Sequence, residues 1–122
     1  IHKIAPDMAV LAISGTQTEQ AARAAGLAVY SEIFADRAYL SSGQLVPRDQ
    51  PDAMIHDPGE AAARLLSFLQ TGLMPVVDGD PIALAAQSIC VHGDSPGALA
   101  MALEIRDRLT AQGVRIASFL TA

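Results

Sequence analysis

Apolar positions divide the chain into short, nearly continuous runs and longer amphipathic stretches. Residues 9–13 form a continuous apolar run, which predicts a strand buried on both faces of a sheet. Residues 88–91 are a second short run and are also predicted to form a strand. Residues 28–32 and 114–118 are two further predicted strands. Because stretches with helical spacing separate these strands, the chain is predicted to be an α/β protein with parallel strands and crossover helices.

The first predicted helix spans residues 17–25. Thr16 precedes Glu19 by three residues, the spacing of a capping box, in which two side chains satisfy free N–H groups at the helix start. Gly26 has the position of a helix-ending glycine. Together with the strands on either side, this helix predicts a βαβ unit with a right-handed crossover.

The second predicted helix begins after Asp57, its capping residue, has Pro58 in its first turn, and ends at Gly72. Glu60 and Arg64 are four residues apart and are predicted to form an ion pair on the outer face. The predicted buried stripe consists of Ala62, Leu65, Leu66 and Leu69.

The third predicted helix covers residues 96–111 and has the clearest amphipathic pattern. Pro96 is expected in its first turn and Gly113 just after its end. Glu104 and Arg108 are predicted to pair on the outer face. The predicted buried stripe consists of Ala98, Met101, Ala102, Ile105 and Leu109.

The remaining segments lack a regular pattern. Residues 34–52 carry glycine and proline breakers and are predicted to form a long loop, which is often a functional feature. Residues 53–56 form at most a short strand. Residues 74–86 are ambiguous, with a possible strand at 74–77 and a turn at 78–81.

Composition fits a single domain over residues 1–122 with a substantial core, since 51% of the residues are hydrophobic. The net charge is −5 and the eight Lys and Arg residues form no run, which argues against binding to nucleic acid or to an anionic membrane surface. No apolar stretch approaches the roughly 20 residues that span a bilayer. A single cysteine, Cys90, favours a reducing cytoplasm. Because the chain starts at Ile1 rather than Met, we expect it to be a piece of something longer.

A first polar cluster follows the predicted strand at residues 88–91. His92, Asp94 and Ser95 lie between this strand and the start of the third helix, where free N–H groups attract anions. His92 can carry a proton or bind a metal ion, and Asp94 can orient it or bind the same metal. The alternative is structural: Asp94 or Ser95 caps the helix, and His92 fills a place at the strand end.

A second polar cluster follows the predicted strand at residues 28–32. Glu32 and Asp36 are candidates for acid–base catalysis or metal binding. Arg37 and Arg48 can each hold a carboxylate or a phosphate through two hydrogen bonds, with Tyr39 beside them. The structural alternative is an ion-pair network that holds the long loop in place.

These two clusters carry a family resemblance. The stretches Glu32–Tyr39, Leu45–Arg48 and Ile89–Asp94, with Gly43, resemble the LamB/YcsF family, the A subunits of 5-oxoprolinase, from about residue 6 to residue 114. The resemblance implies a cytoplasmic bacterial enzyme subunit with a TIM-like barrel of the glycosidase/deacetylase type. It also implies ATP-dependent conversion of 5-oxoproline to glutamate together with two partners, the B and C subunits.

The resemblance further implies that this chain is the carboxyl-terminal half of such a barrel, because the family's amino-terminal motifs do not occur in it. We therefore expect it to associate with the missing amino-terminal half or with a second copy. ATP is expected to act through the assembled complex, and a divalent metal is left open. Two alternatives remain: a metal-dependent amide or acetyl hydrolase of the same barrel type, and a non-catalytic half that only holds partner subunits.

Position and chemistry together define the predicted site. The predicted catalytic residues, as proton carriers or metal ligands, are Glu32, Asp36, His92 and Asp94. The residues predicted to bind a substrate carboxylate or a phosphate are Arg37, Tyr39, Arg48 and Ser95.

Overall fold

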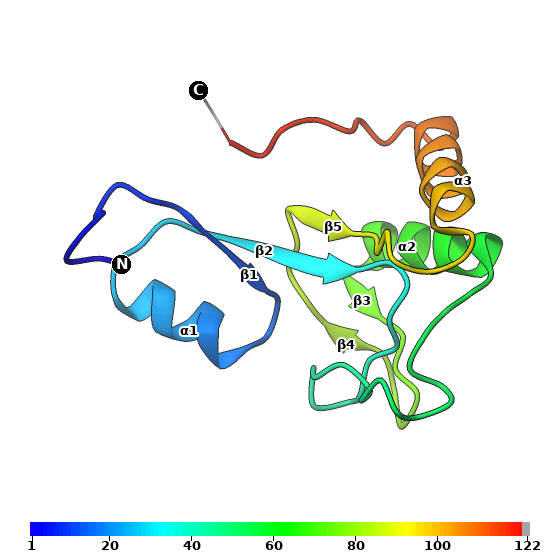
Figure 1. The fold of residues 1–122 in the computed structure, drawn as a ribbon, viewed down its shortest axis with the longest axis horizontal. Coiled ribbons are helices and arrows are strands. Elements are labelled where there is room, and N and C mark those ends of the chain that lie inside the picture. Colours follow the sequence, from blue (N-terminus) through cyan, green and yellow to red (C-terminus); the bar gives the residue numbers. More distant parts are fainter. Residues whose placement is uncertain (121–122) are drawn as a thin grey trace.

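The structure, a computed structural model, describes residues 1–120 and consists of three helices and five strands within that range (Figure 1). In chain order the elements are β1 (Val10–Ile13), α1 (Gln17–Ala24), β2 (Val29–Phe34), α2 (Pro58–Thr71), β3 (Leu73–Met74), β4 (Ile82–Ala83), β5 (Ser88–Cys90) and α3 (Ala98–Ala111). No helix among these residues is both long and apolar enough to cross a membrane.

Three parallel strands form the main sheet, in the order β1-β2-β5. Ile13 pairs with Glu32, and Glu32 pairs with Ser88 on its other side. The short strands β3 and β4 form a separate antiparallel pair and lie between α2 and β5 in the chain. The predicted α/β class with parallel strands is confirmed, as is the β1–α1–β2 unit.

The two faces of the sheet have different surroundings. Side chains alternate along β2, so Ile33 points to the face covered by α2 and α3, where it is fully buried in the core. The other core side chains include Leu65, Phe68, Met101, Ile105 and Leu109. Glu32 points to the opposite face, where its carboxylate accepts a hydrogen bond from Ser88. The core therefore lies on the helix side of the sheet.

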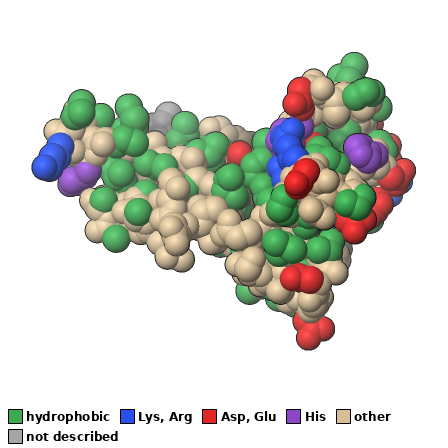
Figure 2. Space-filling model, turned by 60° about the horizontal axis from the view of Figure 1, so that its bottom comes forward, with side chains coloured by type: hydrophobic (Ala, Val, Ile, Leu, Met, Phe, Trp, Pro, Cys, Tyr) green, Lys and Arg blue, Asp and Glu red, His purple; other side chains and the backbone are tan. Residues whose placement is uncertain are grey.

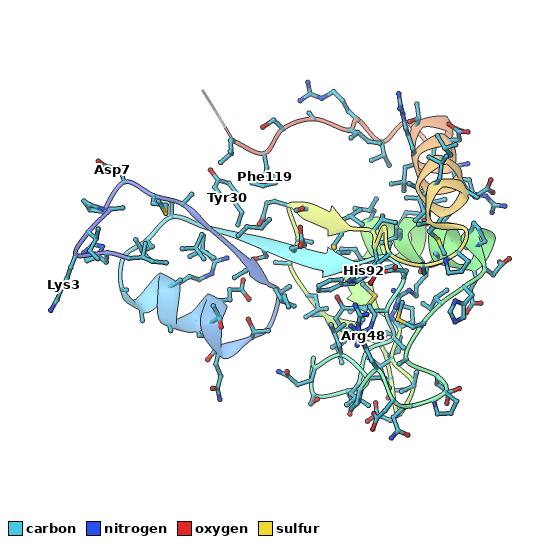
Figure 3. The ribbon with its side chains drawn as sticks, in the orientation of Figure 1. Lys3, Asp7, Tyr30, Arg48, His92 and Phe119 are labelled. Carbon is cyan, nitrogen blue, oxygen red and sulfur yellow. The ribbon has the colours of Figure 1, made fainter. Side chains whose placement is uncertain are left out.

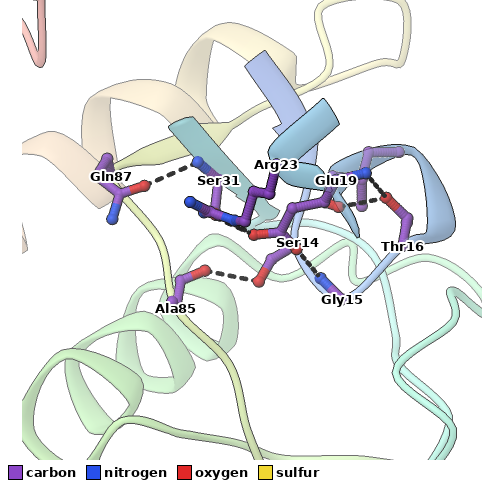
Figure 4. A network of polar contacts seen from close by, with 9 residues as sticks. Ser14, Gly15, Thr16, Glu19, Arg23, Ser31, Ala85 and Gln87 are labelled. Carbon is purple, nitrogen blue, oxygen red and sulfur yellow. Dashed lines mark hydrogen bonds and ion pairs between the residues drawn. The ribbon is translucent and has the colours of Figure 1, made fainter. Parts of the chain in front are cut away.

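A network of polar contacts attaches α1 to the sheet (Figure 4). Thr16 caps the helix through Glu19 N, as predicted. Glu19 accepts hydrogen bonds from Gly15 N, from Arg23 and from the hydroxyl of Ser31 on β2. Burial alone would raise the pKa of Glu19, but these donors outweigh it and hold the pKa below its usual value.

Replacing Glu19 with glutamine is expected to remove part of the acid sensitivity of the fold. Because the folded-state pKa lies below the unfolded value, the carboxylate contributes stability above the unfolded pKa and loses it as pH falls through the folded pKa. Urea unfolding measures the free energy of unfolding at pH 7 and at pH 3. The decrease in this free energy from pH 7 to pH 3 should be smaller for Glu19→Gln than for the unsubstituted protein. The control is Glu104→Gln, which removes an exposed i,i+4 pair. An equal effect of both variants would contradict the prediction.

Helix α2 has the predicted ends but not the predicted faces. Asp57 caps its first turn through Glu60 N, and Gly72 ends it in the left-handed conformation with φ of +72°. Phe68 is buried, whereas Leu69 is 43% exposed, so the buried stripe is rotated from the predicted one. The predicted Glu60–Arg64 ion pair is wrong because Arg64 turns inward to the end of β2.

Helix α3 begins at Ala98, two residues later than predicted, after Gly97 in the left-handed conformation. No side chain caps it, so the alternative in which Asp94 or Ser95 serves as the cap is wrong. The predicted Glu104–Arg108 pair is confirmed, at 2.6 Å between Oε1 and Nε. The buried stripe retains Met101, Ile105 and Leu109 of the predicted set, and Ala102 is exposed.

The segment after α3 is not the predicted strand. Residues 114–118 pair with no other strand in the described part of the chain and run apart from β5 (Figure 1). Phe119 instead packs against Tyr30 of β2, with 4.8 Å between ring centroids. The strand pattern at 114–118 therefore has no partner strand next to it here.

The long segment after β2 is a loop, as predicted, but a packed one. Isolated bridges join Arg37 to Met54 and Tyr39 to Leu45, and Ala53 is fully buried. Residues 53–56 do not form the short strand that the sequence allowed, and only Met54 among them makes an isolated bridge. This loop carries half of the polar residues that the sequence singles out.

Candidate functional site

The candidate site lies where β2 and β5 end side by side. Asp36 follows β2 by two residues and His92 follows β5 by two residues. Phe34 pairs with Cys90, so both strands leave the sheet at the same edge (Figures 1 and 3). The carboxyl ends of parallel strands are the usual place for reactive groups in α/β proteins.

Asp36 and His92 form a hydrogen-bonded pair. Oδ1 of Asp36 lies 2.8 Å from Nδ1 of His92, and Oδ2 accepts a hydrogen bond from the backbone N–H of His92 at 3.2 Å. Asp36 is 3% exposed, and the His92 side chain is 18% exposed. The Phe34 ring stacks on the imidazole with 5.3 Å between centroids. The pair is therefore held by two hydrogen bonds and one aromatic contact.

This geometry determines which imidazole nitrogen is available. With its proton on Nδ1, His92 donates to the buried carboxylate, which leaves Nε2 as a lone-pair acceptor. A pocket of about 20 Å³, room for about one water molecule, lies beside the pair. Ser95 and Gly97 line it next to the start of α3. Proton transfer between His92 and a small bound group is the chemistry that this arrangement supports.

Arg48 and Asp94 lie at the outer edge of the site. Nη1 of Arg48 is 3.9 Å from Oδ2 of Asp94, and both side chains are more than half exposed. Figure 2 shows basic and acidic side chains next to each other on this side of the molecule. An exposed pair at this distance contributes little to stability. Both side chains are therefore free to rearrange around a ligand.

Glu32 lies deeper along the sheet, apart from this pair. It precedes Asp36 by four residues and accepts a hydrogen bond from Ser88 at 2.7 Å. At about 3.3 Å of rise per strand residue, its backbone lies on the order of 10 Å from that of Asp36.

Burial, with Glu32 and Asp36 as negative neighbours, raises the pKa of the Cys90 thiol. Cys90 therefore stays protonated at neutral pH.

Arg37 and Tyr39 are buried inside the loop that carries Asp36. Nη2 of Arg37 donates to the carbonyl oxygen of Val46 at 2.7 Å. The Tyr39 hydroxyl accepts a hydrogen bond from Phe34 N at 2.9 Å, and burial raises its pKa. Both side chains contact the protein interior, so their observed contacts stabilise the loop.

Arg64 is the residue at this site that the sequence reasoning missed. From α2, its Nη2 donates to the carbonyl oxygens of Phe34, Ala35 and Arg37 at 2.8–2.9 Å. The available signal was the position of Arg64 three residues after Ala61 and four before Phe68, both of which are buried. That spacing puts Arg64 on the buried side of the helix.

The described residues offer few ligands for a metal ion. Asp36 and His92 are adjacent, but no group of three His, Cys, Asp or Glu side chains in residues 1–120 is placed to hold a metal. Of the eight predicted site residues, the structure brings together Asp36, His92 and Ser95 around the pocket, and Arg48 with Asp94 beside it.

Comparisons with known proteins give a consistent result. The LamB/YcsF family model matches residues 1–122. The chain is 46% identical over 111 residues to the 5-oxoprolinase A subunit of Syntrophobacter fumaroxidans, covering 91% of this chain and 44% of that protein. It is 46% identical over 119 residues to a 5-oxoprolinase A subunit of Agrobacterium fabrum, covering 98% of this chain and 47% of that protein.

A solved structure agrees with these relatives. The lactam utilization protein from Thermus thermophilus superposes with a TM-score of 0.87 at 39% identity, covering 97% of this chain and 47% of that chain. The present chain thus spans about half the length of the curated relatives it matches.

Proposed function

This chain belongs to the LamB/YcsF family, and from that premise we propose that it forms part of the A subunit of a 5-oxoprolinase. In this proposal the assembled enzyme opens the cyclic amide of 5-oxo-L-proline to give L-glutamate, with consumption of ATP. The observation that carries the proposal is the Asp36–His92 pair, a ready proton acceptor beside a pocket of the size of a water molecule.

Ring opening adds one water across the lactam C–N bond. ATP, bound in the assembled complex, would supply the driving force by transfer of its terminal phosphoryl group, in the end to a second water, which gives ADP and phosphate. The oxygen of the first water bonds to the carbonyl carbon as that water loses a proton, the C–N bond breaks, and the nitrogen gains a proton. Nε2 of His92 accepts the first proton and supplies the second, while Asp36 holds Nδ1–H and stabilises the imidazolium. Positioned acid–base catalysis of this kind contributes about 10²–10⁴-fold in rate.

The other predicted residues take supporting places in this proposal. Arg48, released from Asp94, binds the substrate carboxylate or a phosphate at the entrance. Ser95 lies in the pocket with the first turn of α3. Arg37 and Tyr39 hold the loop from inside, and Glu32 lines the sheet face below the pair, as described above. Asp36 and His92 supply two of the three protein ligands typical of a catalytic zinc. The proposal rests on their hydrogen-bond geometry, which supports proton transfer.

We further propose that residues 1–122 are the carboxyl-terminal half of a TIM-like barrel of the glycosidase/deacetylase type. Both outer strands of the sheet, β1 and β5, have an unpaired edge in the described residues. Exposed apolar side chains such as Leu11 and Ile116 add to the surface available for association. An amino-terminal half that supplies the remaining strands would cover both edges. The B and C subunits complete a cytoplasmic, ATP-dependent enzyme, and a second copy is the alternative partner.

Replacing Asp36 with asparagine in the full-length protein, assembled with its partner subunits, is expected to lower ATP-dependent glutamate release from 5-oxoproline by about 10²-fold or more. The asparagine amide no longer enforces a proton on Nδ1 of His92, so Nε2 loses its lone pair in a large fraction of molecules. The assay compares rates with and without ATP, and thermal unfolding shows that the variant is folded.

The matched control is Asp107→Asn, on the exposed side of α3, which should retain the full rate. An unchanged rate in Asp36→Asn would exclude the pair as the proton acceptor. Glutamate release that needs a divalent metal but no ATP would favour the metal-dependent hydrolase instead.

A further inference from the structure

We propose that Arg64 is a positioning residue that holds Asp36 in register with His92 and thereby keeps the proton of His92 on Nδ1. The inference concerns the same site and rests on the proposed function for its kinetic consequence. Its structural part rests only on the contacts of α2 with the end of β2. Arg64 itself is not among the residues that line the pocket beside His92.

The contacts are unusual in their concentration on one atom. Nη2 of Arg64, with two hydrogens, donates to the carbonyls of Phe34, Ala35 and Arg37, at 2.9, 2.9 and 2.8 Å. The carbonyl of Asp36 is the one left out of this set, and it accepts instead from Ile55 N at 2.9 Å. The backbone on both sides of Asp36 is therefore fixed from two directions.

The charge of Arg64 is partly buried without an adjacent counter-ion. No carboxylate lies within ion-pair distance of it in the described residues, and its Nε has no hydrogen-bond partner there. Burial lowers the pKa of Arg64, while the negative groups around it, Asp36 among them, act in the opposite direction. Neutral donors would satisfy three carbonyls at a lower desolvation cost. Arg64 therefore acts on the site through the three carbonyls to which it donates.

The geometry explains how this affects catalysis. Asp36 contacts the imidazole with Oδ1 and the His92 backbone with Oδ2, so a small turn of its backbone breaks both contacts. Free histidine has two neutral tautomers, and the hydrogen bond at Nδ1 selects one of them. Loss of Arg64 releases that selection, which lowers kcat while leaving KM nearly unchanged.

The test is nitrogen-15 NMR of imidazole-labelled full-length protein, with His92 assigned by the spectrum of His92→Gln. In the unsubstituted protein at high pH we expect Nδ1 to be protonated and Nε2 unprotonated. Arg64→Met keeps most of the length of the side chain but removes its donors and its charge. In this variant we expect the nitrogen-15 chemical shifts of Nδ1 and Nε2 to move toward the average of the two neutral tautomers. Arg64→Lys, whose ammonium has three donors, should restore most of the difference between the two chemical shifts that the unsubstituted protein shows.

Two further variants make the outcome decisive. Arg106→Met, an exposed arginine on α3, should leave the His92 signals unchanged. Arg64→Gln, which keeps one donor group, serves if Arg64→Met does not fold, and it should show the same averaging. A folded Arg64→Met or Arg64→Gln with unshifted His92 signals would overturn the inference. If the signals shift as expected but the unsubstituted assembly releases no glutamate, the proposed reaction fails and the positioning role stands.

Discussion

Replacing His92 with glutamine is expected to lower kcat of the assembled enzyme by about 10²–10⁴-fold, the full contribution of a positioned acid–base group. Glutamine retains hydrogen-bonding capacity toward Asp36 but has no atom that accepts a proton near neutral pH. The KM for 5-oxoproline should change little, because His92 acts on the reacting atoms and Arg48 supplies the binding charge in the proposed site. Steady-state rates of glutamate release over a range of 5-oxoproline concentrations measure both constants.

The matched control for this prediction is His2→Gln, because His2 is exposed. Its neighbour Lys3 lies far from His92 (Figure 3). It should retain the full rate. Rates within threefold of the unsubstituted enzyme for a folded His92→Gln variant would rule out the imidazole as the proton carrier. If the loss of kcat in His92→Gln disappears when it is compared with His2→Gln at equal folded fraction, the loss comes from instability instead.

Replacing Leu65 with alanine is expected to lower the free energy of unfolding by about 2–5 kcal/mol. Leu65 is fully buried on α2, in the cluster that also contains Ile33 of β2 and Ile105 of α3. Truncation removes apolar contacts within this cluster and leaves a cavity that a helix–helix–sheet junction closes poorly. Urea unfolding of the purified full-length protein, followed by circular dichroism, measures the change.

Leu103→Ala is the matched control, because Leu103 is on α3 and 48% exposed. Its effect should stay within about 0.5 kcal/mol. Similar effects of the two substitutions would mean that α2 and α3 do not form the described core against the sheet.

The elements that the sequence predicts well depend on short-range contacts. Thr16 caps α1 and Asp57 caps α2, and Gly72 ends α2 with a positive φ. Each of these signals acts within one or two turns of the chain, so a local pattern contains all the information needed. The alternation of strands and helices follows from these boundaries, which is why the α/β class was predictable.

The features that the sequence predicts poorly depend on contacts between distant segments. Residues 114–118 have a strand pattern, but a strand needs a neighbour, and none pairs with them in residues 1–120. Arg64 has the sequence context of an outward-facing ion pair with Glu60. Its inward direction follows from the free carbonyls at the end of β2, which α2 meets only in the folded molecule.

The site shows the same division. Both clusters could be placed at strand ends from the sequence, but the predicted partner of His92 was Asp94, which instead lies beside Arg48. The register of β2 against β5, with Phe34 opposite Cys90, brings Asp36 to His92. Register is set by packing across the whole sheet, so no local pattern contains it.

The order of strands in the sheet also has a kinetic consequence. Val10 pairs with Val29, a contact that closes a short stretch of chain, whereas Asp36 and His92 are 56 residues apart. The entropic free-energy cost of closing the longer loop is greater by roughly 1 kcal/mol. Contacts between residues this far apart in the sequence slow folding. The β1–α1–β2 unit thus has a low contact order, and we expect the β2–β5 junction to form later in folding. A chain that stalls between these two stages contains a formed βαβ nucleus and no reactive centre.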